Sequence, residues 1–141
     1  MISSVRKFFQ RKPLVVVIRL DGVIGAVSRF GSGGLDDSNT QKLLEKAFEF
    51  EKAKAIAIKI NSPGGSPTQS SLIASRILKL SEEKKIPVLC FCEDVAASGG
   101  YWLACAGEEI YSDINSIIGS IGVISASFGF SELISRYGIE R

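Results

Sequence analysis

The most informative absence in this 141-residue chain is histidine, which does not occur at all. Without an imidazole, the chain by itself can form neither a Ser-His-Asp nor a Cys-His catalytic arrangement, and the common zinc sites are excluded as well. Cysteine is scarce too: Cys90, Cys92 and Cys105 are an odd number without the spacing of a disulfide framework, which favours a reducing compartment. We therefore expect no metal, no other cofactor and a cytoplasmic location.

Net charge and long hydrophobic runs are also small. Seventeen Lys and Arg residues stand against fifteen Asp and Glu residues, an excess too slight to indicate a nucleic-acid partner. The longest apolar run near the start, Leu14–Ile18, is far shorter than the roughly 20 residues that span a bilayer, and no signal-peptide cleavage pattern follows it. Residues 1–12 form a basic segment, for which we favour a frayed terminus; a peripheral contact with an anionic membrane is the alternative.

What the sequence does contain is an ordinary globular composition, with 45% hydrophobic and 23% charged residues, over a length typical of one domain. Hydrophobic and β-branched runs predict buried strands, and capping patterns followed by helical spacing predict the helices between them. The predicted strands are 14–20, 55–60, 88–92 and 109–112, and 117–125 is expected to be extended. The predicted loops are 27–34 and 93–97.

The helices are predicted mainly from their first residues. Ser38–Gln41 and Ser66–Gln69 both have the form of a capping box, and Pro67 stands at the first helical position of the second one. Two further helices are predicted at 98–106 and 130–137. Because strands alternate with helices, we expect residues 13–141 to form a single α/β domain with a largely parallel sheet.

Chemistry is expected where two glycine-bearing loops follow consecutive strands. These loops are Asn61–Gly65 (NSPGG) and Ala96–Gly100 (AASGG). Sites in parallel α/β folds lie at the carboxyl ends of strands, where Ser98 stands beside free backbone amides at the start of a helix. Amides of Gly65 and Gly99 can converge on a substrate carbonyl oxygen, which favours Ser98 as a nucleophile with an oxyanion site. The alternative is that the glycines only permit tight turns and close packing.

These loops resemble those of the signal peptide peptidase A family of serine peptidases. The resemblance rests on Ile60–Gly65 (INSPGG) and Asp94–Tyr101 (DVAASGGY), followed by Ile118–Ile124 (IGSIGVI) as the next signature of the family. It extends from about Leu14 to the end of the sequence. It implies a Clp-protease/crotonase-type fold built from stacked ββα units.

The resemblance also implies roles for individual residues. Ser98 matches the nucleophile of a Ser-Lys dyad, and Gly65 and Gly99 match oxyanion-hole positions. The related Clp proteolytic subunit uses a histidine on the same scaffold, a variant that this composition excludes. The residues assigned to substrate binding are Gly64, Gly100 and Ser120.

The chain departs from the family in its general base. The family's lysine lies downstream of the serine, farther along than the 43 residues that follow Ser98, whereas all ten lysines of this chain lie at or before Lys85. Lys59 is the lysine nearest to a site loop, and we expect it to point outward or to pack against a loop. We therefore expect a domain truncated at its C-terminus, and we expect the 141-residue chain alone to lack peptidase activity.

Other side chains near the two loops are expected to have structural roles. Glu93 and Asp94 are interpreted as loop carboxylates that hold neighbouring amides, although a carboxylate can also act as an acid or base. Trp102 is interpreted as a core or interface aromatic residue. Cys90 and Cys92 fall on one face of a strand and are expected to pack in the core.

Together these observations favour a serine endopeptidase that cleaves peptides in extended form, such as remnants of signal peptides, and that assembles as a homo-oligomer. Two alternatives stay open. A crotonase-like acyl-CoA hydratase or isomerase would share the fold and the two-amide oxyanion site, but it needs catalytic carboxylates and a groove for CoA. A catalytically incomplete fragment would only assemble with partners.

Overall fold

The computed structural model describes residues 13–25, 34–124 and 135–138. Its elements in chain order are β1 Leu14–Asp21, α2 Asp37–Phe48, β2 Ala53–Ser62, α3 Pro67–Lys84, β3 Val88–Ala97, α4 Gly99–Ala104, β4 Glu109–Ser112 and β5 Ile117–Gly119. No helix within these ranges is long and apolar enough to cross a membrane. The basic segment 1–12, nearly all of the loop predicted at 27–34 and most of the helix predicted at 130–137 lie outside the described residues.

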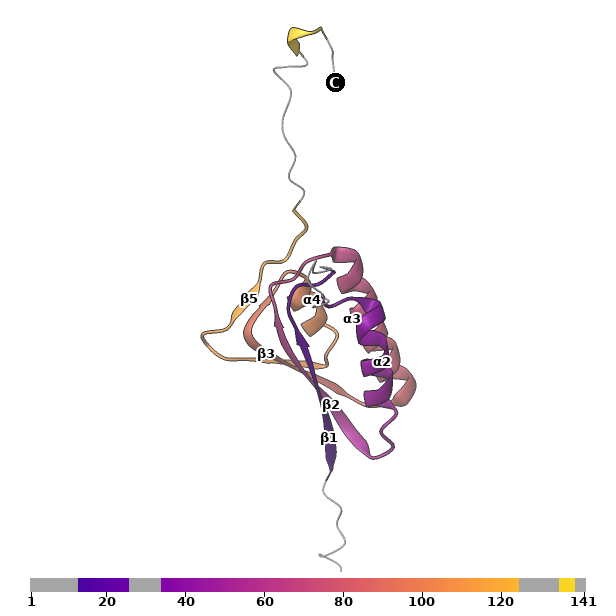
Figure 1. The fold of residues 1–141 in the computed structure, drawn as a ribbon. Helices are drawn as coiled ribbons and strands as arrows, with labels where there is room; N and C mark the ends of the chain where they lie inside the picture. The colour runs from indigo at the N-terminus through magenta and orange to yellow at the C-terminus, as the bar shows by residue number, and fades with distance from the viewer. Residues whose placement is uncertain (1–12, 26–33, 125–134, 139–141) are drawn as a thin grey trace, which may run out of the picture.

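The strands form one sheet, and every strand pairing in the described part of the chain is parallel. β1, β2, β3 and β4 lie side by side in that order, and β5 pairs with the last residues of β3. Figure 1 shows α2 and α3 running along one face of this sheet. The predicted α/β class with a largely parallel sheet is confirmed.

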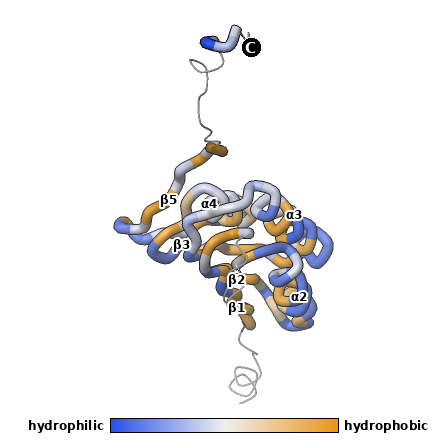
Figure 2. The backbone as a smooth tube through the Cα atoms, turned by 45° about the horizontal axis from the view of Figure 1, so that its top comes forward, coloured by the Kyte–Doolittle hydropathy of each residue, from blue (hydrophilic) through white to orange (hydrophobic). Residues whose placement is uncertain are grey.

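The core lies between the sheet and the helices. Alternate strand residues such as Ile18, Ile58 and Cys90 are at most 2% exposed and belong to the same cluster as Leu44 of α2 and Ile73 of α3. Figure 2 shows the strands as largely hydrophobic and the outer sides of α2 and α3 as hydrophilic. This alternation places the residues between them, Lys59 among them, on the opposite face of the sheet.

The start of α2 differs from the prediction. The helix begins at Asp37 with Asp36 as its N-cap, two residues before the capping box expected at Ser38. Asp36 Oδ1 accepts the Asn39 N–H at 2.8 Å and the Ser38 hydroxyl at 2.6 Å. These hydrogen bonds, that of Ser38 first, lower the pKa of Asp36. A carboxylate is a stronger acceptor than a hydroxyl and is favoured at the positive end of a helix, so Asp36 displaces Ser38 as the cap.

The end of β3 also differs. Residues 93–97 were predicted to be a loop, but β3 continues to Ala97. Val95–Ala97 pairs with β5, and Ala96 pairs with Ser62 of β2 after an irregularity in the register. Asn61 Oδ1 also accepts the Val95 N–H at 3.2 Å. Tertiary pairing on both sides therefore gives strand structure to residues whose own sequence does not predict it.

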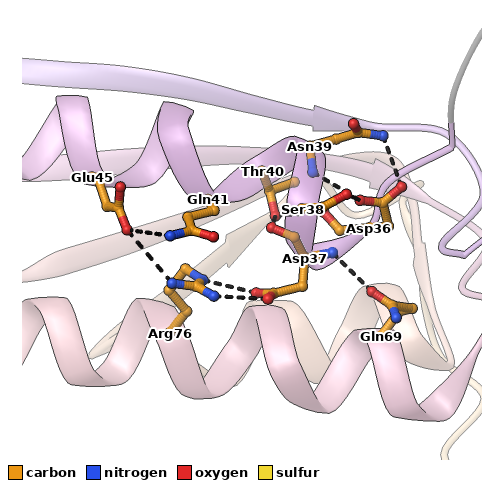
Figure 3. Close-up of polar contacts among 9 residues, drawn as sticks. All are labelled: Asp36, Asp37, Ser38, Asn39, Thr40, Gln41, Glu45, Gln69 and Arg76. Carbon is orange, nitrogen blue, oxygen red and sulfur yellow. Dashed lines mark hydrogen bonds and ion pairs between the residues drawn. The ribbon is translucent and has the colours of Figure 1, made fainter.

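Gln69 and Arg76 of α3 both bond to Asp37 in the first turn of α2, as Figure 3 shows. The N-cap predicted at Ser66 is confirmed, since its Oγ accepts the Gln69 N–H at 3.4 Å. The Gln69 side chain does not complete a capping box and instead accepts the Asp37 N–H of α2 at 2.8 Å. Asp37 accepts two hydrogen bonds from the Arg76 guanidinium at 2.8 and 2.7 Å. This network fixes the start of α3, which borders the candidate site.

We expect Asp37→Asn to lower the free energy of unfolding by about 1 kcal/mol at neutral pH, because it removes a bidentate, partly buried ion pair. The hydrogen bond from Arg76 lowers the pKa of Asp37 below its ordinary value of 3.8. The contribution is therefore fully present above that value and is lost as the pH falls through the lowered pKa of the folded state. Urea unfolding of both proteins from pH 7 to pH 3 measures the difference.

The control is Glu83→Gln, which breaks the exposed Lys79–Glu83 pair at 3.8 Å. An exposed pair of this kind adds little stability, so this variant should unfold like the wild type at every pH. A difference for Asp37→Asn that stays constant down to pH 3 would contradict the role given to the ion pair.

Candidate active site

Ser98 stands at the junction between β3 and α4, where it is the N-cap of the helix. Its backbone has φ 52° and ψ −118°, a left-handed conformation that is uncommon for a residue with a side chain. The Ser98 N–H donates to the Gly119 carbonyl at 2.8 Å, and its own carbonyl accepts the Trp102 N–H at 3.0 Å. Two backbone hydrogen bonds thus hold a strained serine at a helix N-terminus, as strained residues at functional sites are commonly held.

The loop after β2 lies directly against this serine. A methyl group on Gly64 would lie 2.7 Å from the Gly99 nitrogen and 2.9 Å from Ser98 Cβ, so only a glycine permits this approach. Gly64 also has φ 95°, a conformation that favours glycine. The sequence-based expectation that the two glycine loops meet is confirmed.

The amides of Gly65 and Gly99 have no hydrogen-bond partner in the described part of the chain. Gly65 forms a parallel bridge with Ile24, in which Ile24 bonds to Gly64 and Ser66 on either side. In a parallel pairing with this hydrogen-bond pattern, the Gly65 N–H points away from Ile24. Gly99 is the first residue of α4, where the N–H has no acceptor within the helix. Within the described residues, both N–H groups are therefore left without an acceptor.

A cavity of about 340 Å³ opens beside Ser98, with walls that are largely apolar. A second hollow of about 500 Å³ shares Gly65, Pro67, Ser98 and residues 121–123 with it and extends to Ser120 and Ile124. The residues that line the first cavity are Gly65, Pro67, Ser98, Gly99, Tyr101, Trp102, Cys105, Ile121, Gly122 and Val123. Together the two hollows follow residues 120–124 after β5, where the positive φ of Ser120 (52°) and Gly122 (153°) interrupts the extended conformation predicted for 117–125.

The three residues predicted to bind substrate lie in different positions relative to the two hollows. Ser120 lines the second hollow, and Gly64 packs behind Ser98 and Gly99. Gly100 is buried, and a methyl group there would overlap the Ser62 carbonyl, so the structure does not bring it to the cavity. Trp102, expected in the core or an interface, is 45% exposed and forms part of the cavity wall.

Lys59 and Glu93 form an ion pair on the sheet face opposite the helices. Lys59 Nζ forms an ion pair with Glu93 Oε1, and the Arg19 guanidinium lies 2.9 Å from Oε2 without hydrogen-bond geometry. The hydrogen bond from Lys59 lowers the pKa of Glu93, so this carboxylate is a weaker base than an ordinary glutamate. The expectation of an outward Lys59 is confirmed.

Among residues 13–25, 34–124 and 135–138, no side chain is hydrogen-bonded to the Ser98 hydroxyl as a base would be. The Ser98 side chain makes no capping hydrogen bond. Cys90 and Cys92 are buried as predicted, and burial raises the pKa of Cys90 to about 12. The sequence analysis assigned no location to Cys105. It is exposed and lines the first cavity.

Sequence reasoning missed two residues that support the glycine loops, Ile24 and Ser70. Ser70 is fully buried, donates its hydroxyl to the Ser66 carbonyl at 2.9 Å and lies against Gly99. Ile24 is 1% exposed and bonds to the Gly65 loop. The signal for Ile24 was its position between Gly22 and Gly25, at the end of a buried strand.

Comparisons with known proteins found one matching family model and several similar curated proteins. The model of Peptidase family S49 matches residues 81–141. Serine protease SPPA, chloroplastic, of Arabidopsis thaliana is 36% identical over 131 residues, which are 90% of this chain and 19% of that protein. The Na(+)/H(+) antiporter NhaA of Brucella melitensis biotype 1 is 50% identical over 136 residues, 96% of this chain and 18% of that protein. The chain thus spans about a fifth of the length of these curated relatives.

A solved structure has the same fold. It is a mutant of the 1510-N membrane-bound stomatin-specific protease, with a TM-score of 0.62 and 24% identity over 91% of this chain and 60% of that one. The expected Clp-protease-like fold is consistent with this neighbour.

We expect Gly99→Ala to destabilise the fold by about 1–3 kcal/mol, because its methyl group would overlap the hydroxyl of Ser70. Ser70→Ala removes that hydroxyl at a cost of about 1 kcal/mol for the lost hydrogen bond. The double variant should therefore be more stable than the sum of the two single effects predicts, by about 1 kcal/mol. Denaturant unfolding of the four proteins measures this coupling, and strict additivity would show that Ser70 does not limit the space at Gly99.

Proposed function

Because this chain belongs to peptidase family S49, we propose that it carries the nucleophile and the oxyanion site of a serine endopeptidase of the signal peptide peptidase type. The observation that carries the proposal is the position of Ser98 at a helix N-terminus, beside the Gly65 and Gly99 amides and at the mouth of an apolar cavity. A hydroxyl, two nearby backbone N–H donors and an apolar cavity suit the acylation of a serine by a peptide.

In this mechanism Ser98 Oγ attacks the carbonyl carbon of the scissile peptide bond, and its proton passes to a base. The carbonyl oxygen becomes an oxyanion that accepts hydrogen bonds from the Gly65 and Gly99 amides, each worth about 3 kcal/mol of the barrier. The intermediate collapses to an acyl-enzyme as the base returns the proton to the leaving amine. Water, activated by the same base, then hydrolyses the ester.

The base in this proposal is a lysine outside the described residues, which completes a Ser-Lys dyad. Lys59 is unsuited because it is committed to Glu93 on the other face of the sheet. A longer chain, or a second copy in a homo-oligomer, can supply the lysine. Near the apolar cavity an ammonium group would be desolvated, which lowers its pKa and favours the neutral amine that a base requires.

The substrate in this proposal is an extended peptide. Residues 121–123 line both hollows, and an extended peptide beside them would have backbone groups to pair with and apolar cavities for alternate side chains. Remnants of signal peptides, which are rich in apolar residues, match such cavities. In this proposal Ser120, which lines the second hollow, contacts the substrate.

The other candidate activities have less support. An acyl-CoA hydratase or isomerase needs carboxylates beside the oxyanion site, and Glu93 is instead paired with Lys59 and Arg19. The similarity to the antiporter covers only 18% of that protein's length. It covers 96% of this chain, and both glycine loops lie within the matched residues. That shared part carries the peptidase motifs, so ion antiport is not the function we propose here.

We expect the 141-residue polypeptide alone to hydrolyse fluorogenic peptides no faster than the background, because a serine hydroxyl needs an adjacent base. A longer form that includes the downstream region of the relatives should hydrolyse them. In that form Ser98→Ala should lower turnover at least ~10³-fold, whereas Ser112→Ala, on the exposed strand β4, should leave it unchanged.

A fluorophosphonate reagent gives a second readout on the longer form. Its phosphorus should bond to Ser98 Oγ with release of fluoride, and peptide mapping by mass spectrometry locates the adduct. Turnover that survives Ser98→Ala, or hydration of an enoyl-CoA by the same protein, would overturn the peptidase proposal.

A further inference from the structure

We propose that Ile24 is the positioning residue of the oxyanion site, one that sets the Gly65 and Gly99 amides relative to each other. The inference rests on the proposed function, because it concerns the same two donors. Ile24 touches no substrate and takes no proton. It lies behind both glycines, where its backbone contacts one loop and its side chain contacts the other.

The backbone of Ile24 holds the Gly65 loop from both sides. The Ile24 N–H donates to the Gly64 carbonyl at 2.8 Å, and its carbonyl accepts the Ser66 N–H at 2.8 Å. A methyl group added to Gly65 would overlap the Ile24 carbonyl. The peptide groups before and after Gly65 are thus both tied to one residue, so the direction of the Gly65 N–H depends on where Ile24 sits.

The side chain of Ile24 reaches the other donor. It is 1% exposed, and its Cδ1 lies 3.1 Å from the position that a methyl group on Gly99 would occupy. The same isoleucine therefore packs under the first turn of α4. Because the interior is close-packed, a change in the volume of this side chain moves the groups that rest on it.

Ile24 is itself fixed by strands that precede the site. On one side, the Gly22 N–H donates to the Asn61 carbonyl at 2.9 Å, which ties the end of β1 to the end of β2. On the other, the Gly25 N–H donates to the Leu35 carbonyl at 2.6 Å, and the Leu35 N–H donates to the Val23 carbonyl at 3.0 Å. Ile24 is therefore held between the two loops by hydrogen bonds of its neighbours to Asn61, at the start of the first loop, and to Leu35, which lies outside both loops.

The test measures the oxyanion site without requiring turnover. A peptide boronic acid bonds through boron to Ser98 Oγ, releases the hydroxyl proton to solvent and places a boron-bound oxygen where the oxyanion forms. Its affinity is measured by calorimetry, and the Gly65 and Gly99 amide resonances are followed by ¹H–¹⁵N NMR. We expect Ile24→Ala to weaken binding by about tenfold or more, since small misplacements of catalytic groups are costly, and to reduce the shift of both amides on binding.

Two further variants keep the inference testable. Ile18→Ala is the matched control, since Ile18 is 2% exposed on β1 and pairs with Ile58, away from the loops; it should lose stability but keep wild-type affinity. Ile24→Val should stay folded, bind a few-fold more weakly and move the same two resonances. If Ile24→Ala does not fold, the boronate affinity and the amide resonances of Ile24→Val provide the test.

The outcomes separate the inference from the proposed function. Wild-type affinity in a folded Ile24 variant, or an equal loss in Ile18→Ala, would overturn the role of Ile24 and leave the peptidase proposal intact. Failure of the wild type to bind the boronate, or binding that is unchanged by Ser98→Ala, would overturn the oxyanion site itself and the role of Ile24 with it.

Discussion

The close backbone contact between the loop after β2 and the loop after β3 is the constraint on which the site depends. Gly64 approaches the Gly99 nitrogen and Ser98 Cβ so closely that no side chain fits between them. Parallel neighbouring strands bring both loops to the same edge of the sheet. The irregular register that pairs Ser62 with Ala96 then brings their backbones together. This contact sets Ser98, whose φ is 52°, directly against the loop that carries Gly65.

Charge is kept away from this contact. The ion pairs of Arg19 and Lys59 with Glu93 lie on the sheet face opposite the helices, while Ser98 opens onto a largely apolar cavity. In such surroundings hydrogen-bond donors act at a low effective dielectric, where they stabilise a developing charge more than they would in water. In the proposed peptidase, such a site would stabilise the oxyanion with backbone amides alone, and a group outside the described residues would carry out proton transfer.

Much of this fold could be predicted from the sequence because its strands are continuous apolar runs and α3 begins with Ser66 and Pro67. The two glycine loops could be placed at the same edge for the same reason. Three features could not be predicted. The cap of α2 depended on competition between Asp36 and Ser38; the strand at 93–97 depends on pairing with residues 117–119. The contacts of Ile24 reach loops 40 and 75 residues away in the sequence, which no local pattern records.

The two walls of the cavity differ in how they are held. On one side, α4 packs against the core, with Leu103 and Ala104 fully buried. On the other side, the segment 120–124 follows the three-residue strand β5, and its Ile121 and Val123 are 83% and 72% exposed; Figure 2 shows this hydrophobic segment leading away from the sheet. A wall with few buried contacts opens at low free-energy cost. A bound extended peptide would bury these side chains and add the contacts that the segment lacks, so in the proposed peptidase, substrate binding would itself complete the second wall of the site.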